Sequence, residues 1–125
     1  MNNTVLLSVG CNRDYETQMQ RIRECLSEAF PDARFTASLL SPAFDEGEEA
    51  PPYSNMLVRF STLLNEERLS QRLKLLEQEC GDSKLLRSQG IVMMDLDILL
   101  FNNEKRHLRD WSRSYITTLL NKQGI

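Results

Sequence analysis

The pattern of hydrophobic and polar positions in the first forty residues predicts a strand, a helix and a second strand. Residues 5–9 form a short apolar run that Gly10 ends, as is typical of a buried strand. Between 15 and 30, apolar residues recur at steps of three and four, and Asp14 is placed to cap that helix. Residues 34–40 are compatible with a second strand.

The segment 41–53 separates this half of the chain from the next. It holds three of the four prolines and an acidic cluster at 45–49, so we expect a loop. A third strand is predicted at 55–61, where every second residue is Met, Val or Phe.

The second helix has the clearest pattern in the chain. Leu69, Leu73 and Leu76 fall on one face of it. Asn65 can cap its start, and Gly81 suits its C-terminal exit.

The remaining segments complete the predicted fold. Residues 82–90 have no convincing periodicity and are expected to form an exposed loop, and 92–101 are predicted to form the last strand. The order β-α-β followed by β-α-β predicts an α+β, ferredoxin-like sandwich, in which helices cover one face of a mainly antiparallel sheet. At 125 residues, the chain is expected to be a single domain, 1–125.

Composition and charge exclude several classes of protein. At 41% hydrophobic and 26% charged the chain resembles an ordinary globular domain, and no apolar run is long enough to span a membrane. A net charge of −3 gives no reason to expect nucleic acid as a partner, although 105–113 is basic and holds the only histidine, His107. The first residues lack a signal-peptide pattern, and three cysteines without a C-x-x-C pair indicate a reducing compartment. We therefore expect a cytoplasmic protein.

Two aspartates, Asp95 and Asp97, lie one residue apart in the apolar stretch MMDLDILLFNN. Side chains two apart on a strand project to the same face, so both carboxylates are expected on one face. Leu96, Ile98 and Leu100 would then enter the core. The two Cα atoms would be roughly 6–7 Å apart, which allows both carboxylates to bind Mg²⁺. The alternative is a solvated strand face with two ordinary acids, but paired like charges on a central strand are costly unless a cation neutralises them.

Six short motifs occur in an order that is typical of one family. They are LLSVGCN, SPAF, PPYSNMLVRFSTLL, LLEQECG, DLDILLF and HLRDWSRSYI. DLDILLF is highly specific, PYSN before a strand is moderately so, and GCN alone is weak. On these motifs, which cover most of the chain, the sequence resembles the 6-hydroxymethyl-7,8-dihydropterin pyrophosphokinases of folate biosynthesis, a ferredoxin-like family.

The resemblance implies Mg²⁺-dependent transfer of diphosphate from ATP to 6-hydroxymethyl-7,8-dihydropterin, leaving AMP. Asp95 and Asp97 would hold two Mg²⁺ ions, and Arg113 would act with them in catalysis. The resemblance implies a pterin site formed by Gly10, Pro42, Phe44, Tyr53, Asn55 and Tyr115, with Tyr115 as the stacking ring. It implies ATP contacts from Glu77, Lys84, Arg87, His107 and Arg113. No protein partner is indicated.

Each of these residues also has an ordinary structural interpretation. Tyr53 and Asn55 could close a turn, and Glu77 could be a charge on a helix surface. His107 could be an exposed histidine. Tyr115 could belong to an amphipathic packing face. These interpretations stay open for each residue alone, while the order of the motifs favours the family.

The segment before the aspartates departs from the family pattern of G-R-x-R, further basic residues and W-x-P-R-T. Here Asp82 follows Gly81, Gln89 stands in place of the tryptophan, and IVM replaces P-R-T. The proline-containing segment that typically follows in the family is also not found after YITTLL. Loss of one charge-assisted donor of this kind commonly costs a factor of about a hundred to a thousand in rate.

Three interpretations follow. The first is a divergent but working pyrophosphokinase, in which Lys84 and Arg87 partly replace the family's arginines. The second is a catalytically impaired, pyrophosphokinase-like binding or protein-interaction module. An RNA-binding sheet fits poorly, because the chain is acidic and lacks the aromatic strand that stacks bases. The retained Asp95 and Asp97 favour the first.

Overall fold

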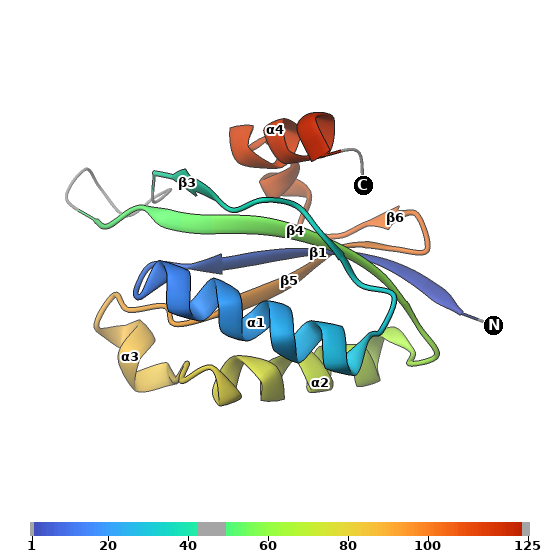
Figure 1. Ribbon diagram of the computed structural model, residues 1–125, viewed down its shortest axis with the longest axis horizontal. Coiled ribbons are helices and arrows are strands. Elements are labelled where there is room, and N and C mark those ends of the chain that lie inside the picture. The colour runs from blue at the N-terminus through green and yellow to red at the C-terminus, as the bar shows by residue number, and fades with distance from the viewer. Residues whose placement is uncertain (1, 43–49, 124–125) are drawn as a thin grey trace.

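Within residues 2–42 and 50–123, which the computed structural model describes, six strands form one sheet with helices on both of its faces (Figure 1). In chain order the elements are β1 (Asn3–Cys11), α1 (Tyr15–Ala29), β2 (Arg34–Phe35), β3 (Leu39–Ser41), β4 (Tyr53–Thr62), α2 (Glu66–Glu79), α3 (Lys84–Ser88), β5 (Asp95–Phe101), β6 (Glu104–Lys105), a 3-10 helix (Leu108–Ser112) and α4 (Ser114–Gln123).

The sheet has the strand order β2-β4-β1-β5-β6, with β3 also paired to β4. Every described pairing is antiparallel. This is the ferredoxin-like arrangement, in which β1 lies at the centre between β4 and β5 and the strand predicted at 34–40 is represented by β2 and β3 together. The predicted α+β sandwich is therefore confirmed.

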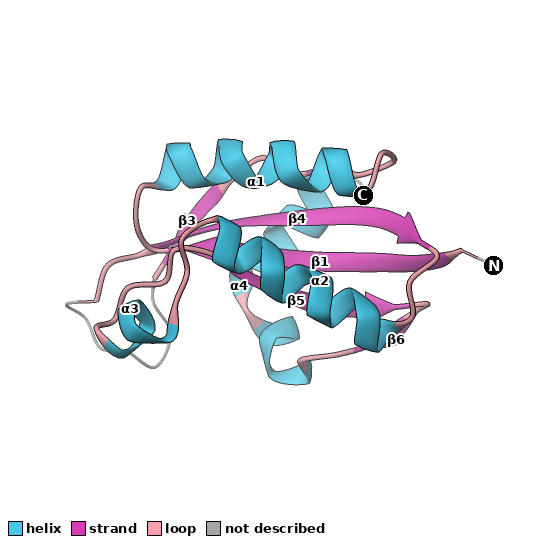
Figure 2. Cartoon of the chain, turned by 90° about the horizontal axis from the view of Figure 1, so that it is seen from below, coloured by secondary structure: helices cyan, strands magenta, loops and turns pink. Residues whose placement is uncertain are grey.

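The helices α1 and α2 cover one face of the sheet (Figure 2). A first core cluster lies between them and the sheet, and it buries Leu69, Leu73 and Leu76 as their spacing predicts. The other face is covered by α4 through a second core cluster, made of Leu6, Leu57, Leu99, Tyr115, Ile116 and Leu119. The predicted helices, α1 and α2, therefore cover one face as expected, and α4 adds a cover that was not predicted, because the central strands carry apolar residues on both faces and both need burial.

Helix capping follows the prediction at α2 but not at α1. Asn65 Oδ1 accepts a hydrogen bond from the N–H of Arg68 at 2.9 Å. Gly81 lies just after the end of α2 and has a left-handed φ of 91°. Asp14 precedes α1 with a left-handed φ of 49°, and its side chain makes no capping bond. The predicted cap is wrong there, because a capping side chain needs an extended backbone to reach the first turn. No helix among the described residues is long and apolar enough to cross a membrane.

The interruption between β2 and β3 has a local cause at Thr36. Its hydroxyl accepts a hydrogen bond from the N–H of Leu57 at 2.9 Å, and its own N–H donates to the Leu57 carbonyl at 2.9 Å. A side chain thus takes the place of a backbone carbonyl in the ladder, so the pairing is interrupted before β3 resumes it.

The segment predicted as a loop at 82–90 contains the short helix α3, so that prediction is wrong in its secondary structure. Ser83 Oγ caps the helix by accepting the N–H of Leu86 at 3.1 Å, and Gly90 ends it with a φ of 78°. Most of the segment is nevertheless exposed, as predicted. A helix of one turn is too short to show a hydrophobic period, and only its capping residues could have indicated it.

The last strand begins at Asp95, later than predicted. The residues before it are held by Asn12, which is buried at the end of β1. Val92 donates its N–H to Asn12 Oδ1 at 2.8 Å, and the Asn12 N–H donates to the Val92 carbonyl at 2.9 Å. A side-chain amide therefore replaces strand pairing over this stretch.

A bulge in β5 changes which residues face which core cluster. Leu96 and Ile98 enter the first cluster, as predicted. The pairing with β1 then shifts at Leu99, and both Leu99 and Leu100 pack toward the second cluster. Leu100 was expected on the same face as Leu96 and Ile98, and that expectation is wrong. An extra residue in a strand reverses the alternation of the residues that follow it.

Candidate functional site

Asp95 and Asp97 lie on β5 with β1 on one side and an open strand edge on the other. In the β1–β5 ladder, Asp95 pairs with Gly10 and Asp97 pairs with Ser8. Among the described strands, β6 pairs only with the last two residues of β5, so no described strand pairs with the outer edge beside the aspartates. The carboxylates project from the face opposite the first core cluster, because that cluster contains the residues that alternate with them.

Two cavities meet at this aspartate pair, which lines both of them. The larger cavity, about 670 Å³, lies between α2, the open edge of β5 and the residues that follow β6. The smaller cavity, about 170 Å³, lies over β1, β3, β4 and the start of α4. Ligands bound in the two cavities would therefore meet at the two carboxylates.

The electrostatics of the pair favour a bound cation. Burial raises the pKa of Asp97 to about 8, and the nearby negative charge of Asp95 is the second cause. Additional negative charge comes from Asp110 and Glu77. His107 Nε2 lies 4.0 Å from Asp97 Oδ1. Close carboxylates that share a half-buried site are stabilised when a positive charge binds between them.

The donor set fits Mg²⁺ that is held only in part by protein. Mg²⁺ prefers oxygen ligands and is commonly bound through one or two carboxylates together with waters and substrate phosphates. In the part of the chain that the structure describes, no three His, Cys, Asp or Glu side chains form a group that could hold a metal alone. Asp95 and Asp97 therefore suit Mg²⁺ that arrives with a phosphate ligand.

The smaller cavity brings together most of the residues that the sequence implied for a pterin site. It is lined by Gly10, Pro42, Tyr53, Asn55 and Tyr115. Phe44 lies outside the described residues. Asn55 is only 4% exposed, and its Nδ2 donates to Ser41 Oγ at 2.5 Å and to the Tyr53 carbonyl at 3.3 Å. A Cβ atom on Gly10 would lie 3.4 Å from Asn55 Oδ1, so glycine keeps this wall of the cavity open.

Tyr115 serves both the core and the smaller cavity. Most of its ring is buried in the second core cluster, which supports the packing interpretation of this residue. Its hydroxyl is hydrogen-bonded to Ser8, and burial raises its pKa. Tyr115 therefore presents a limited part of its surface to the cavity.

The larger cavity is lined by three of the residues implied for ATP, namely Glu77, Arg87 and His107. Lys84 is exposed on α3 and lines neither of these two cavities. Arg113 lines the smaller cavity, where its Nε lies 3.1 Å from Asp110 Oδ1. The implied phosphate-binding cations therefore approach the aspartates from both sides.

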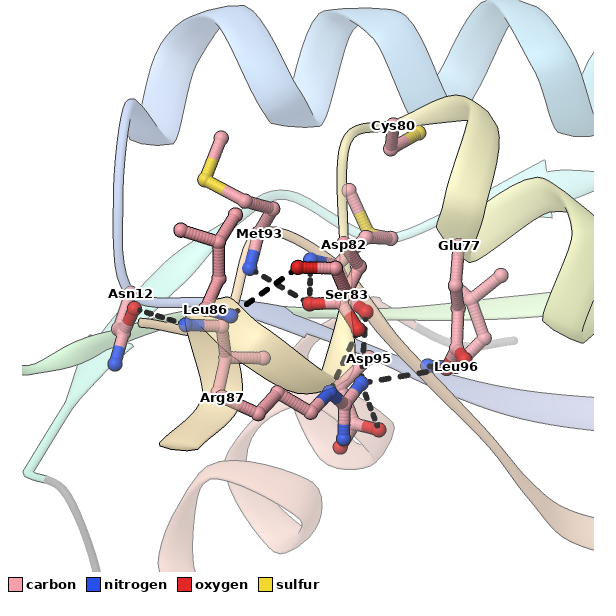
Figure 3. A network of polar contacts seen from close by, with 12 residues as sticks. Asn12, Glu77, Cys80, Asp82, Ser83, Leu86, Arg87, Met93, Asp95 and Leu96 are labelled. Atoms are coloured by element: carbon pink, nitrogen blue, oxygen red, sulfur yellow. Dashed lines mark hydrogen bonds and ion pairs between the residues drawn. The ribbon is translucent and has the colours of Figure 1, made fainter. Parts of the chain in front are cut away.

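The side chain of Arg87 extends from α3 toward β5, and its guanidinium lies close to three carboxylates (Figure 3). Its Nε lies 2.6 Å from Asp82 Oδ2, and its Nη2 lies 3.4 Å from Asp95 Oδ1 and 3.8 Å from Glu77 Oε2. Glu77 also accepts the N–H of Leu96 at 2.8 Å, on the open edge of β5, and burial raises its pKa. This network places one cation beside the aspartate pair at the border of the larger cavity.

Several residues of the site were not predicted from the sequence. They include Ser8, Ser41, Arg106 and Asp110. The alternation along β1 could have indicated Ser8, which faces the same side as Gly10. Arg106 forms a two-point ion pair with Glu66, at 2.8 and 2.9 Å, which joins the segment after β6 to the start of α2. Ser41 and Asp110 lie within the SPAF and HLRDWSRSYI motifs, but only the tertiary structure brings β3 and the 3-10 helix to the cavity.

The chain is 31% identical over 109 residues to the 2-amino-4-hydroxy-6-hydroxymethyldihydropteridine pyrophosphokinase of Bacillus subtilis (strain 168). The match covers 83% of this chain but 63% of that protein, so the chain spans less than two thirds of the relative's length. A crystal structure from Burkholderia cenocepacia, described as an amidohydrolase/peptidase, matches with a TM-score of 0.44 and 15% identity over 99% of this chain and 34% of its own, which is too distant to inform function.

The sequence pattern of one family extends over almost the whole chain. It is that of 7,8-dihydro-6-hydroxymethylpterin-pyrophosphokinase (HPPK), and it matches residues 6–122. The matched region includes both core clusters from Leu6 onward and both aspartates. The chain therefore belongs to the HPPK family.

Proposed function

We propose that this chain transfers diphosphate from ATP to 6-hydroxymethyl-7,8-dihydropterin, giving AMP, as a step of folate biosynthesis. One observation carries the proposal: Asp95 and Asp97 line two adjoining cavities at once. The reaction requires a nucleotide phosphate and a pterin hydroxyl to meet, and the border between the cavities would bring them together. Family membership indicates the two substrates.

At this border, Asp95 and Asp97 would hold Mg²⁺, and two ions are expected when ATP is bound. Bound Mg²⁺ supplies neutralisation of phosphate charge and alignment of the reacting groups. His107 and Arg113 would donate hydrogen bonds to phosphate oxygens from either side of the pair. Arg113 would act with the two aspartates in catalysis.

The smaller cavity would bind the pterin. Asn55 is held by Ser41 and would present its amide to the polar edge of the ring. Pro42 and Tyr53 would form walls, with Phe44 as a further candidate in the neighbouring segment. Tyr115 would contribute an edge of the site, because most of its ring packs in the core.

The larger cavity would bind ATP. Arg87 and His107 would contact the phosphates, and Glu77 would border the nucleotide from the end of α2. Lys84 lies one helical turn before Arg87 on α3, and it would add positive charge near the phosphate chain.

A second candidate function is a catalytically impaired module that binds these ligands without turnover. Asp82 favours it, since a carboxylate occupies the position where the family pattern has arginine and pairs with Arg87. Part of the positive charge otherwise available to the transferring phosphates is neutralised by this pair.

The test is AMP release from ATP and Mg²⁺, with and without 6-hydroxymethyl-7,8-dihydropterin, at high protein concentration. The matched control is an Asp95→Ala/Asp97→Ala variant whose folding is verified by circular dichroism. We expect AMP that depends on the pterin and disappears in the variant. Saturable nucleotide binding without pterin-dependent AMP would favour the impaired module, and the absence of both would reject the proposed function.

A further inference from the structure

Asp82 lies at the centre of the polar network that joins α3 to the start of β5 (Figure 3). Its side chain is only 7% exposed, and both of its oxygens accept hydrogen bonds. Oδ2 accepts from Arg87 Nε at 2.6 Å, and Oδ1 accepts from the N–H groups of Met93 at 3.0 Å and Met94 at 3.4 Å. One carboxylate therefore contacts both the arginine and the backbone that leads into Asp95.

One side of the Arg87 guanidinium contacts other groups of the protein, and another side faces the larger cavity. Its Nη2 donates to the Met94 carbonyl at 3.0 Å and lies 3.4 Å from Asp95 Oδ1. The side chain is nevertheless 38% exposed and lines the larger cavity. An arginine has five N–H donors, so donors remain for a ligand after these contacts are made.

The contact with Asp82 gives Arg87 its direction. It is the shortest ion pair of the arginine, and it engages Nε, the donor nearest to the side-chain stem. A long side chain that lost this contact would regain rotamer freedom and would have to be ordered again when a ligand binds. The carboxylate thus reduces the ordering cost of an anion contact made by the rest of the guanidinium.

We infer that Asp82 is a positioning residue, which holds Arg87 at the border between the larger cavity and Asp95 for binding of a nucleotide polyphosphate. The inference rests on the proposed function for the identity of that ligand. Asp82 would then assist nucleotide binding, although it stands where the family pattern has an arginine. The chain would therefore place a cation near the phosphates from α3 by means of Asp82.

The variant Asp82→Asn separates the two contacts of this residue. Its amide oxygen can still accept the N–H groups of Met93 and Met94, so the backbone before β5 remains held. Its amide nitrogen cannot accept from Arg87 Nε, so the contact that orients the arginine is lost. A structural role alone would therefore leave the variant almost unaffected, while a positioning role would not.

The experiment measures the affinity of a non-hydrolysable ATP analogue with Mg²⁺ for four proteins: wild type, Asp82→Asn, Arg87→Ala and the double variant. We expect Asp82→Asn to weaken binding about tenfold in the wild-type background, the scale of one charge-assisted hydrogen bond. In the Arg87→Ala background the same change should have no further effect, because Asp82 acts through Arg87. In turnover assays, the KM for ATP should rise while the KM for the pterin stays unchanged.

Two controls accompany this cycle. Asp32→Asn is a matched change elsewhere, at a carboxylate that accepts hydrogen bonds from Ser61 and lines neither of the two cavities, and it should leave nucleotide affinity unchanged. The Nε–H resonance of Arg87, followed by NMR without nucleotide, should exchange slowly with water in the wild type and rapidly in Asp82→Asn. This readout depends neither on turnover nor on ligand.

The outcomes are distinct. Wild-type affinity in Asp82→Asn, an equal loss in the Arg87→Ala background, or a rapidly exchanging Nε–H in the wild type would each overturn the inference. Nucleotide binding without pterin-dependent AMP would reject the proposed function while the cycle still decides the role of Asp82. A wild-type protein that does not bind the analogue would overturn both.

Discussion

The two cavities that meet at Asp95 and Asp97 are built from different kinds of structure. The smaller one is formed over four strands, β1, β3, β4 and β5, and its polar side chains Ser8 and Asn55 are buried. The larger one is bordered by the polar surface of α2 and by long charged side chains such as Arg87. Strands hold hydrogen-bonding groups at fixed positions, whereas long side chains depend on ion pairs to hold theirs.

This difference indicates how each side should respond to change. The smaller cavity should discriminate by shape and by the hydrogen bonds of Asn55, so small steric changes should weaken one ligand selectively. The larger cavity should depend on charge, so loss of an ion pair should matter more there than a change of volume. Substitutions on either side of Asp95 and Asp97 can test this contrast.

Replacement of Asp97 by Asn should impair both sides at once, because this carboxylate lines both cavities. We expect pterin-dependent AMP release to fall at least about a hundred- to a thousandfold. The thermal midpoint should stay equal or rise, since a neutral amide is less costly to bury beside Asp95 than a carboxylate. Turnover assays and thermal unfolding of the same preparations measure the two effects, and wild-type activity would show that Asp97 is no metal ligand.

Truncating one core residue on each face of the sheet should weaken the binding of a different ligand in each case, because each residue packs beside a different cavity. Ile116→Ala on α4 and Leu73→Ala on α2 should each cost about 2–5 kcal/mol of unfolding free energy, measured in urea. Ile116→Ala should weaken pterin binding more, because α4 also carries Tyr115. Leu73→Ala should weaken nucleotide binding more, because Leu73 lines the larger cavity. Equal loss of both ligands in both variants would contradict the contrast.

A valine at Gly10 should block the smaller cavity alone. A Cβ there would already lie 3.4 Å from Asn55 Oδ1 and 3.6 Å from Tyr53 Cδ2, so the larger side chain would fill space next to both. We expect pterin affinity to fall about ten- to a hundredfold, the scale of one to two mispacked contacts, while nucleotide affinity is unchanged. Gly10→Ala is the graded control and should lie between. Both affinities can be measured by titration calorimetry.

The smallest expected effect concerns the ion pair between Glu66 and Arg106 on the larger side. Its hydrogen bonds lower the pKa of Glu66 below the ordinary value of 4.5, so the pair stabilises the fold fully above pH 4.5 and less as the pH falls through the lowered value. Glu66→Gln should remove this part of the pH dependence and lower the thermal midpoint at pH 7 by at most a few degrees, because the pair is partly exposed. Glu67→Gln, at a neighbouring acid that forms no ion pair with described residues, is the control for thermal scans at several pH values. An unchanged pH profile in Glu66→Gln would show that this pair contributes nothing to stability.

The features that could be predicted were local ones. The face of α2 follows from the spacing of its leucines, and its start follows from Asn65, because a helix repeats every 3.6 residues and its cap acts within one turn. Asp95 and Asp97 could be placed on one strand face for the same reason, since alternation needs no knowledge of the rest of the chain.

The features that could not be predicted depend on contacts between distant segments. Thr36 interrupts a strand by bonding to β4, and Asn12 holds residues that were predicted to extend β5. The bulge at Leu99 reverses the alternation only for the residues after it, and no local pattern marks its position. In the sequence, Asp82 is notable only because it stands where the family pattern has an arginine. The structure shows that its carboxylate accepts hydrogen bonds from Arg87 and from the backbone before Asp95.

From the sequence alone, the β-α-β and β-α-β order of the main elements, the ferredoxin-like fold class and the shared face of the two carboxylates could be predicted, since each depends on periodicity within a single element. Only the tertiary structure decided that α4 covers the second face of the sheet, that two cavities share the aspartates, and that Arg87 is held beside them by Asp82. Each of these results requires segments far apart in the chain to pack against one another, and such packing has no signature in the spacing of neighbouring residues.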